Sequence, residues 1–178
     1  MSIDFTCGEY SVSCAIGEQP VVYSTLVERA TLHDDLTKGA EGTLLFVAVT
    51  KAGDPWPELT VTQRFSPGPE GGFHPGIMLI PEHHLLFIGA GTRLLSYDLD
   101  SVRRLWEDQA DMGFWHWKRH DDVILMSAEL ELAAWDVYGR KLWSTFVEPP
   151  WYVAVTNGQV ELDIMGKLST FPIATGPK

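Results

Sequence analysis

One pattern of apolar and polar residues is written twice within residues 85–143. Each copy has a short apolar strand, a turn of small residues and a second strand that ends in an aromatic residue and Asp, at Tyr97-Asp98 and Trp135-Asp136. In both copies a short turn, a basic pair and Leu-Trp follow, ending at Trp106 and Trp143. A strand pattern that repeats at this spacing predicts tandem antiparallel β-meanders.

The repeat region extends over residues 77–173 and contains three units. Four short strands per unit indicate an all-β fold that is a small β-propeller-like array, with a β-sandwich as the alternative. The expected strands are 77–80, 85–88 and 94–97 in the first unit, 114–117, 123–126, 130–135 and 142–147 in the second, and 151–156, 159–165 and 168–173 in the third.

The third unit has three strands, and two registers fit it. In the preferred one Trp151 is the counterpart of Trp115 and the outermost strand is missing; in the other, Asp163 aligns with Asp98 and Asp136 and the first strand is missing. Because a free sheet edge invites aggregation, ring-shaped β proteins often complete the last blade with the other terminus. We therefore predict that residues 3–7 pair with residues 168–173.

The first 66 residues carry weaker strand patterns, which we place in the same single β domain, residues 1–178. A Gly- and Pro-rich connector, residues 66–76, joins them to the repeats. The expected elements are one or two strands in 2–16, a strand in 21–27, a helical turn or a loop in 33–39, a strand covered on both faces in 44–49 and a half-buried strand in 58–65.

The net charge indicates which classes of partner are unfavourable. The net charge of -11 repels phosphate backbones and anionic lipid, which argues against nucleic acid and membrane surfaces as partners.

The first residues lack a basic and apolar leader pattern, and no run reaches membrane-spanning length. Cys7 and Cys14 could face each other across a small hairpin, but two thiols in a reducing compartment are simpler, so we expect a cytoplasmic protein.

The aromatic-Asp and Leu-Trp segments resemble the repeat of pyrroloquinoline-quinone-type (quinoprotein-like) β-propellers over about residues 76–147. The resemblance implies that Asp98 with Trp106, and Asp136 with Trp143, lock neighbouring blades together. Quinone-dependent members have six to eight blades, whereas at roughly 40 residues per blade this chain has room for about four. The resemblance therefore implies the scaffold without the cofactor, and we expect no cofactor.

The sequence contains six histidines, a residue type that can bind a metal ion or act as an acid/base catalyst. His83 and His84 are adjacent and would point to opposite faces of a strand, so a turn is favoured over a metal site. The motif His-Asp-Asp occurs at residues 33–35 and 120–122, where carboxylates beside an imidazole suit a cation or a general base, although these residues are also common in turns. No serine lies in a Gly-x-Ser-x-Gly motif. We expect no metal site and no catalytic signature.

In a blade, the loops that lead into the first strand and those that join the second strand to the third emerge on one face. Rigid aromatic groups on such loops suit a binding surface. Trp115 and Trp151 could instead pack between blades. The residues expected on this face are His74, Arg93, Trp115, His116, Glu129, Glu131 and Trp151.

Three functional hypotheses follow. The first is a non-catalytic module that binds a protein or peptide. The second is an enzyme for a small molecule that uses His74, His116 and Glu129 as acid/base groups. The third is a subunit that completes a larger propeller as a homo-oligomer.

Overall fold

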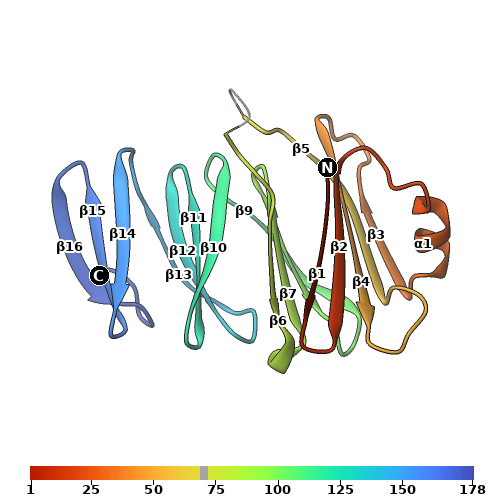
Figure 1. Ribbon diagram of the computed structural model, residues 1–178. Helices are drawn as coiled ribbons and strands as arrows, with labels where there is room; N and C mark the ends of the chain where they lie inside the picture. Colours follow the sequence, from red (N-terminus) through yellow and green to blue (C-terminus); the bar gives the residue numbers. More distant parts are fainter. Residues whose placement is uncertain (69–71) are drawn as a thin grey trace.

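The computed structural model describes residues 1–68 and 72–178, so residues 69–71 of the connector lie outside the described part. The fold is nearly all β, as expected. Its strands form four separate sheets that stand side by side in a row, and the chain passes from one sheet to the next in sequence order (Figure 1). No helix in the described residues is long and apolar enough to span a membrane.

The three repeats form the second, third and fourth sheets, which contain all the expected strands, and β9 (Arg103–Gln109), for which no range was predicted, completes the second sheet. Each of these sheets is an antiparallel meander. The second sheet contains β6 (Gly76–Ile80), β7 (Leu85–Ala90), β8 (Arg93–Asp98) and β9 (Arg103–Gln109); the third contains β10 (Phe114–His120), β11 (Val123–Ala128), β12 (Glu131–Asp136) and β13 (Lys141–Phe146); the fourth contains β14 (Trp151–Thr156), β15 (Gln159–Ile164) and β16 (Lys167–Pro172).

Equivalent hydrogen bonds show that the preferred register of the fourth sheet is correct. The residue after the third strand donates its N–H to the turn between the first and second strands: Leu99 to His84 at 2.7 Å, Val137 to Asp122 at 3.1 Å and Ile173 to Gly158 at 2.9 Å. The fourth sheet therefore lacks its outermost strand.

The alignment of individual residues needs a correction of one position. Phe114 pairs with Ala128, and Trp151 pairs with Ile164. Trp151 is therefore the counterpart of Phe114 and not of Trp115. A bulge between Phe114 and His116, which the sequence pattern does not reveal, produces the offset.

An aromatic contact at the outer strands joins each repeated sheet to the next. The Nε1 of Trp106 donates to the carbonyl of Gly139 at 2.6 Å, and the Nε1 of Trp143 donates to the carbonyl of Ile173 at 2.6 Å. The indole of Trp106 stacks on Trp135 of the following sheet, with centroids 5.5 Å apart. Trp106 and Trp143 thus hold neighbouring sheets together, as the resemblance implies, whereas Asp98 and Asp136 accept hydrogen bonds within their own turns.

The predicted pairing between the two ends of the chain is wrong. β1 (Ser2–Cys7) pairs with β2 (Tyr10–Gly17), and β16 pairs only with β15. The two termini belong to sheets at opposite ends of the row (Figure 1). The sheets form an open row because the first sheet already uses β1 within its own hairpin.

The first sheet has five strands and one helix. Its strand order is β1-β2-β4-β5-β3, in which β3 (Leu32–Leu36) runs parallel to β5 (Leu59–Phe65) and β4 (Thr43–Lys51) is central. β4 is buried on both faces, as its apolar run predicts. Leu45, Val47 and Val49 face the second sheet, whereas Phe46 and Ala48 face the helix α1 (Tyr23–Arg29).

Three expectations for this region are wrong. Residues 21–27 were expected to form a strand, but most of them belong to α1, because Tyr23, Leu26 and Val27 lie on one helical stripe against the sheet. Residues 33–39 were expected to be a helical turn or a loop, but β3 occupies the first part. β5 was expected to be half-buried and is almost fully buried, because α1 and β3 cover it.

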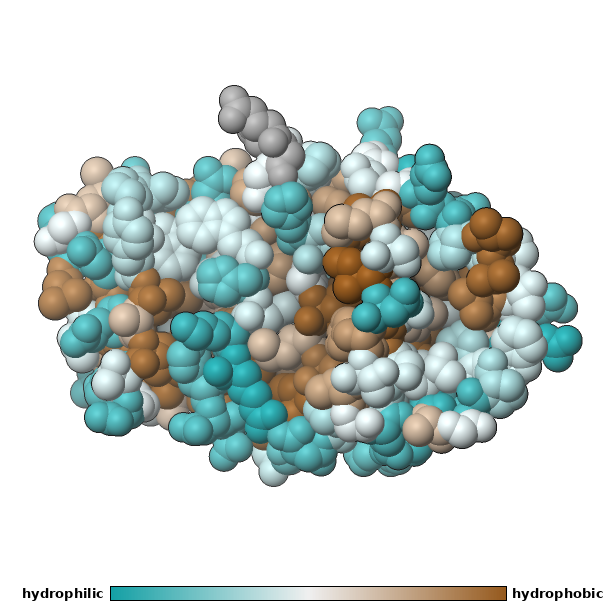
Figure 2. Space-filling model, in the orientation of Figure 1, coloured by the Kyte–Doolittle hydropathy of each residue, from teal (hydrophilic) through white to brown (hydrophobic). Residues whose placement is uncertain are grey.

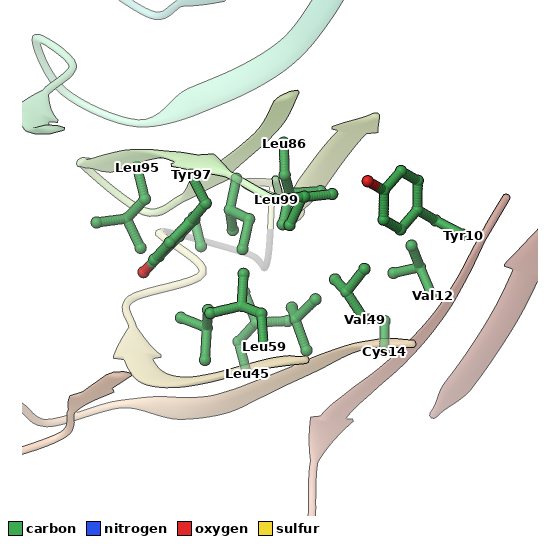
Figure 3. Packing of buried hydrophobic residues seen from close by; sticks show 14 of the residues in the cluster. Tyr10, Val12, Cys14, Leu45, Val49, Leu59, Leu86, Leu95, Tyr97 and Leu99 are labelled. Atoms are coloured by element: carbon green, nitrogen blue, oxygen red, sulfur yellow. The ribbon is translucent and has the colours of Figure 1, made fainter. Parts of the chain in front are cut away.

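The core between the first and second sheets is built from side chains of both (Figure 3). The first sheet contributes Tyr10, Val12, Leu45 and Leu59, and the second contributes Leu86, Leu95, Tyr97 and Leu99, all of which are at most 1% exposed. Interdigitated packing of this kind fixes the two sheets relative to each other. It therefore also fixes the loops at their ends.

Candidate functional site

The loops leading into each first strand and the hairpins between second and third strands lie at one end of the molecule, as predicted. Backbone hydrogen bonds link them: Phe114 donates to Gly91 at 2.7 Å, and Glu129 donates to Gly113 at 3.0 Å. We call this end the loop face; it lies at the top of Figure 1. It comprises residues 66–68, 72–75, 91–92, 110–113, 129–130, 147–150 and 165–166. The opposite end is the turn face.

Trp115 and Trp151 meet at the loop face between the third and fourth sheets. Their rings are stacked, with centroids 5.2 Å apart and an interplanar angle of 11°. Trp151 is only 6% exposed, and its Nε1 donates to the carbonyl of Glu129 at 3.1 Å, whereas Trp115 is 36% exposed. Trp151 thus packs between sheets and supports Trp115, whose outer surface is open to solvent.

Glu131 stabilises the loop that leads to Trp115. It is 8% exposed, and its Oε2 accepts the backbone N–H of Asp111 at 3.1 Å. Its Oε1 lies 3.5 Å from Nζ of Lys141. Met112, in the same loop, has a φ of 62° and a side chain that is 52% exposed. Glu131 therefore positions an exposed apolar side chain and has little surface of its own for a ligand.

A pocket of about 380 Å³ opens beside this loop, between the first and second sheets. Phe65, Phe73, Ala90 and Met112 form its apolar wall; its polar and remaining lining residues are Glu41, Arg64, Ser66, Gly68, Gly91, Thr92, Arg93, Gln109 and Gly113.

The ring of Phe73 packs closely against two glycines. A Cβ at Gly68 or Gly113 would lie 2.3 Å from the Phe73 ring, so neither position accepts a side chain without moving it. The N–H of Phe73 donates to the carbonyl of Pro67 at 2.9 Å. The described part of the connector thus forms one wall of the pocket.

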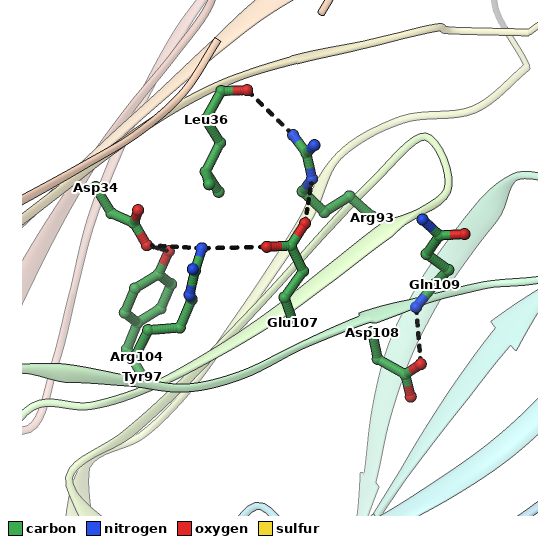
Figure 4. A network of polar contacts seen from close by, with 8 residues as sticks. All are labelled: Asp34, Leu36, Arg93, Tyr97, Arg104, Glu107, Asp108 and Gln109. Atoms are coloured by element: carbon green, nitrogen blue, oxygen red, sulfur yellow. Dashed lines mark hydrogen bonds and ion pairs between the residues drawn. The ribbon is translucent and has the colours of Figure 1, made fainter. Parts of the chain in front are cut away.

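Arg93 enters this pocket from a polar network (Figure 4). Its Nε donates to Glu107 at 3.0 Å, and its Nη1 donates to the carbonyl of Leu36 at 3.3 Å. Nη1 of Arg104 lies 3.2 Å from both Glu107 and Asp34, and Asp34 accepts the hydroxyl of Tyr97 at 2.8 Å. Burial and the Asp34 carboxylate raise the pKa of Tyr97, which keeps this hydroxyl a donor. Arg93 is therefore held in place.

The remaining candidates are spread over the loop face. His74 is exposed in the connector, His116 is exposed at the start of β10, and Glu129 lies in the β11–β12 hairpin. Partial burial and the Lys118 charge lower the pKa of His116. Neither the pocket above nor a second one of about 410 Å³ at the turn face, which contains His120, is lined by His74, His116 or Glu129. The structure does not bring these three side chains to one cavity.

The histidine motifs lie in turns and in strands. Pro81–His83 is a short 3₁₀ helix and His84 has left-handed backbone angles, which agrees with the predicted turn. In β3, Nδ1 of His33 lies 3.0 Å from the Thr60 hydroxyl. Asp121 is in the turn after His120, with a φ of 51°. Within residues 1–68 and 72–178, no group of three His, Cys, Asp or Glu side chains is arranged to hold a metal ion.

The sequence pattern does not reveal several pocket residues, among them Arg64, Phe65, Phe73 and Met112. The sequence carries only an indirect signal for them. Phe65 directly precedes the Gly- and Pro-rich connector and Phe73 lies within it, and aromatic residues in such a segment can form the wall of a pocket.

No family model matches the chain, and no curated protein matches it. Among solved structures, it is similar to the computationally designed Ika4 protein, with 16% identity over 57% of this chain and 67% of that chain and a TM-score of 0.44.

Two natural proteins show similarity at the same level. Hydrazine synthase of Kuenenia stuttgartiensis has 11% identity over 80% of this chain and 49% of its own, with a TM-score of 0.44. Sqt1 of Saccharomyces cerevisiae has 15% identity over 76% of this chain and 43% of its own, with a TM-score of 0.42. The chain thus spans less than half the length of either natural protein. Its own strand order and registers define an all-β protein with propeller-like repeats.

Proposed function

We propose that this protein is a non-catalytic module that binds a peptide, or an extended segment of another protein, at the loop face. The observation that carries the proposal is the stacked pair of Trp115 and Trp151. A half-exposed indole held on a buried one offers a large apolar contact that loses little conformational freedom on binding, as binding hot spots do.

The neighbouring loop supports the same surface. Met112 exposes an adaptable apolar side chain beside a pocket large enough for one side chain of a ligand. A rigid aromatic group, a flexible apolar group and a pocket along one loop suit an extended peptide better than a flat protein surface. The net charge of -11 argues against nucleic acid or an anionic membrane as the partner.

The quinoprotein-like repeat serves in this proposal as a scaffold alone. The blades hold the loops in place, and no quinone enters the proposed binding step. Cys7 and Cys14 are both free thiols, in keeping with action in the reducing environment of the cytoplasm.

The test is selection of binders from a random peptide library displayed on phage, followed by measured affinities of synthetic peptides. We expect Trp115→Ser to weaken the selected peptides by about tenfold or more, as loss of an aromatic anchor does. Tyr152→Ser, which removes a 71% exposed aromatic from the outer face of the fourth sheet, is the matched control and should leave affinity unchanged. Peptides that bind both variants equally, or a selection that enriches none, would refute the proposal.

A further inference from the structure

The loop-face pocket combines an apolar floor with two guanidinium groups. Phe65, at 5% exposure, and Ala90, at 1%, close the bottom, and Phe73 forms a side wall. Arg64 and Arg93 both line the same cavity, and Glu41 is the one carboxylate among its described lining residues. This composition suits a ligand that has an apolar part and a negatively charged part.

Both arginines are held in place and still have donors to offer. Arg64 donates through Nη1 to the carbonyl of Gly42 at 2.8 Å, and Arg93 uses Nε and Nη1 for Glu107 and Leu36. A guanidinium carries five N–H donors, so these contacts leave the second Nη of each side chain for a ligand. Arg64 also keeps its Nε, so one edge of its guanidinium offers the planar pair of donors that matches a carboxylate.

Charge makes the pocket distinct from the rest of the molecule. The chain has 24 acidic and 13 basic residues, yet the described lining of this cavity has two arginines and one glutamate, with Glu107 paired to Arg93 beside it. Glu41 and Glu107 balance the charges of the two arginines, so an anionic group meets less repulsion here than over most of the acidic surface. The pocket therefore suits a localised negative charge that accepts hydrogen bonds from the remaining guanidinium donors.

We propose that the pocket binds an apolar side chain flanked by a carboxylate, within the peptide that the loop face recognises. This inference rests on the proposed function. Gly113 lines the pocket, and Trp115 lies two residues further along the chain at the start of β10, so one extended peptide can reach both. The volume of about 380 Å³ accommodates one apolar side chain and its carboxylate.

The test uses fluorescein-labelled peptides and fluorescence anisotropy. The first is Gly-Ser-Gly-Ser-Gly-Phe with a free carboxyl terminus, the second is the same peptide with a terminal amide, and the third has an internal Phe-Glu pair and a terminal amide. We expect the first or the third to bind at least about tenfold more tightly than the second, because charged hydrogen bonds contribute about 1.5–3 kcal/mol. Tighter binding of the first identifies the peptide terminus as the source of the carboxylate, and tighter binding of the third identifies an acidic side chain.

Variants assign the effect to the pocket. Arg64→Gln should remove most of the preference for the charged peptide, and Arg64→Lys should restore part of it. Arg103→Gln makes the same charge change at the far end of the β8–β9 hairpin and should leave the preference intact. Circular dichroism confirms that each variant is folded.

The inference is overturned if all three peptides bind equally, if none binds, or if Arg64→Gln and Arg103→Gln behave alike. These outcomes are separate from the test of the proposed function. If library peptides depend on Trp115 but carry no carboxylate preference, the pocket assignment fails alone.

Discussion

Cys14 is 5% exposed in the core between the first and second sheets, whereas Cys7 lies at the end of β1 and is partly exposed. Burial, with a smaller contribution from Asp4, raises the pKa of the Cys14 thiol to about 11. Since the thiolate is the reactive form, we expect iodoacetamide at pH 8 to label Cys7 and to spare Cys14 until urea unfolds the chain. Mass spectrometry of tryptic peptides measures this, and equal labelling of both residues in the folded protein would contradict the burial of Cys14.

Glu58 provides a test of pH dependence. Burial, followed by the charges of Asp54, Glu9 and Asp100, raises its pKa against the opposing effect of Lys51. The folded chain then binds more protons than the unfolded one in the window above the unfolded pKa of about 4.3, so ionisation of this carboxyl lowers stability as pH rises through that window.

We therefore expect Glu58→Gln to raise the free energy of unfolding at pH 8 and to have much less effect at pH 4, where wild-type Glu58 is protonated too. Urea denaturation at the two pH values measures the difference. Glu28→Gln, at an exposed position of α1, is the control. An effect of Glu58→Gln that is the same at both pH values would contradict this account.

At the residue scale, the sequence identified Trp115 and Trp151 but not their different roles. Both are aromatic residues near the start of a first strand, and only the bulge after Phe114 makes one buried and the other half-exposed. Arg93 was expected on the loop face, but its partner in the pocket, Arg64, was not, because the two residues meet through packing of separate sheets.

At the scale of elements, Trp106 and Trp143 allow a matched test of the repeat. Each indole donates to a backbone carbonyl of the following sheet at 2.6 Å. Trp106→Phe and Trp143→Phe keep an aromatic ring and remove that bond, so each should lower the free energy of unfolding by about 1 kcal/mol. Urea denaturation compares them with Trp56→Phe, a 40% exposed control. Losses that differ several-fold between the two variants would show that the sheets are not joined in an equivalent way.

The strands of the repeats were predictable, and those of the first sheet were only partly so. In the repeats, the same pattern of apolar and polar residues occurs twice, so each copy supports the strands assigned in the other. α1 was missed because its β-branched sequence has strand propensity, and packing of Tyr23, Leu26 and Val27 on the first sheet overrides it. In β3, Asp34 occupies a core-facing position, where Tyr97 and Arg104 from another sheet pair with its carboxylate.

At the scale of the whole molecule, the two ends of the row differ from the sheets inside it. α1 covers the outer face of the first sheet. The outer face of the fourth sheet carries Glu161, Asp163 and Thr170 together with the exposed Tyr152 and Leu168. Its β15 has exposed residues between buried ones, whereas β11 and β12 in the third sheet are buried on both sides. The two carboxylates make this face a less favourable surface for another blade than the faces between the internal sheets.

We therefore expect a monomer rather than a subunit of a larger ring. Light scattering after size-exclusion chromatography at micromolar concentration should give the mass of one chain. The mass of two or more chains would contradict this expectation and favour completion of a ring by further copies. Figure 2 shows one side of the molecule, on which apolar residues gather in several places among polar residues.

Location of the binding surface is the central claim, and hydrogen–deuterium exchange with a selected peptide bound tests it most directly. We expect slower exchange in residues 110–116 and 148–152 of the loop face, and unchanged exchange in residues 81–84, 120–123 and 157–158 of the turn face. Protection confined to the turn face, or to the outer face of β14 to β16, would contradict the account.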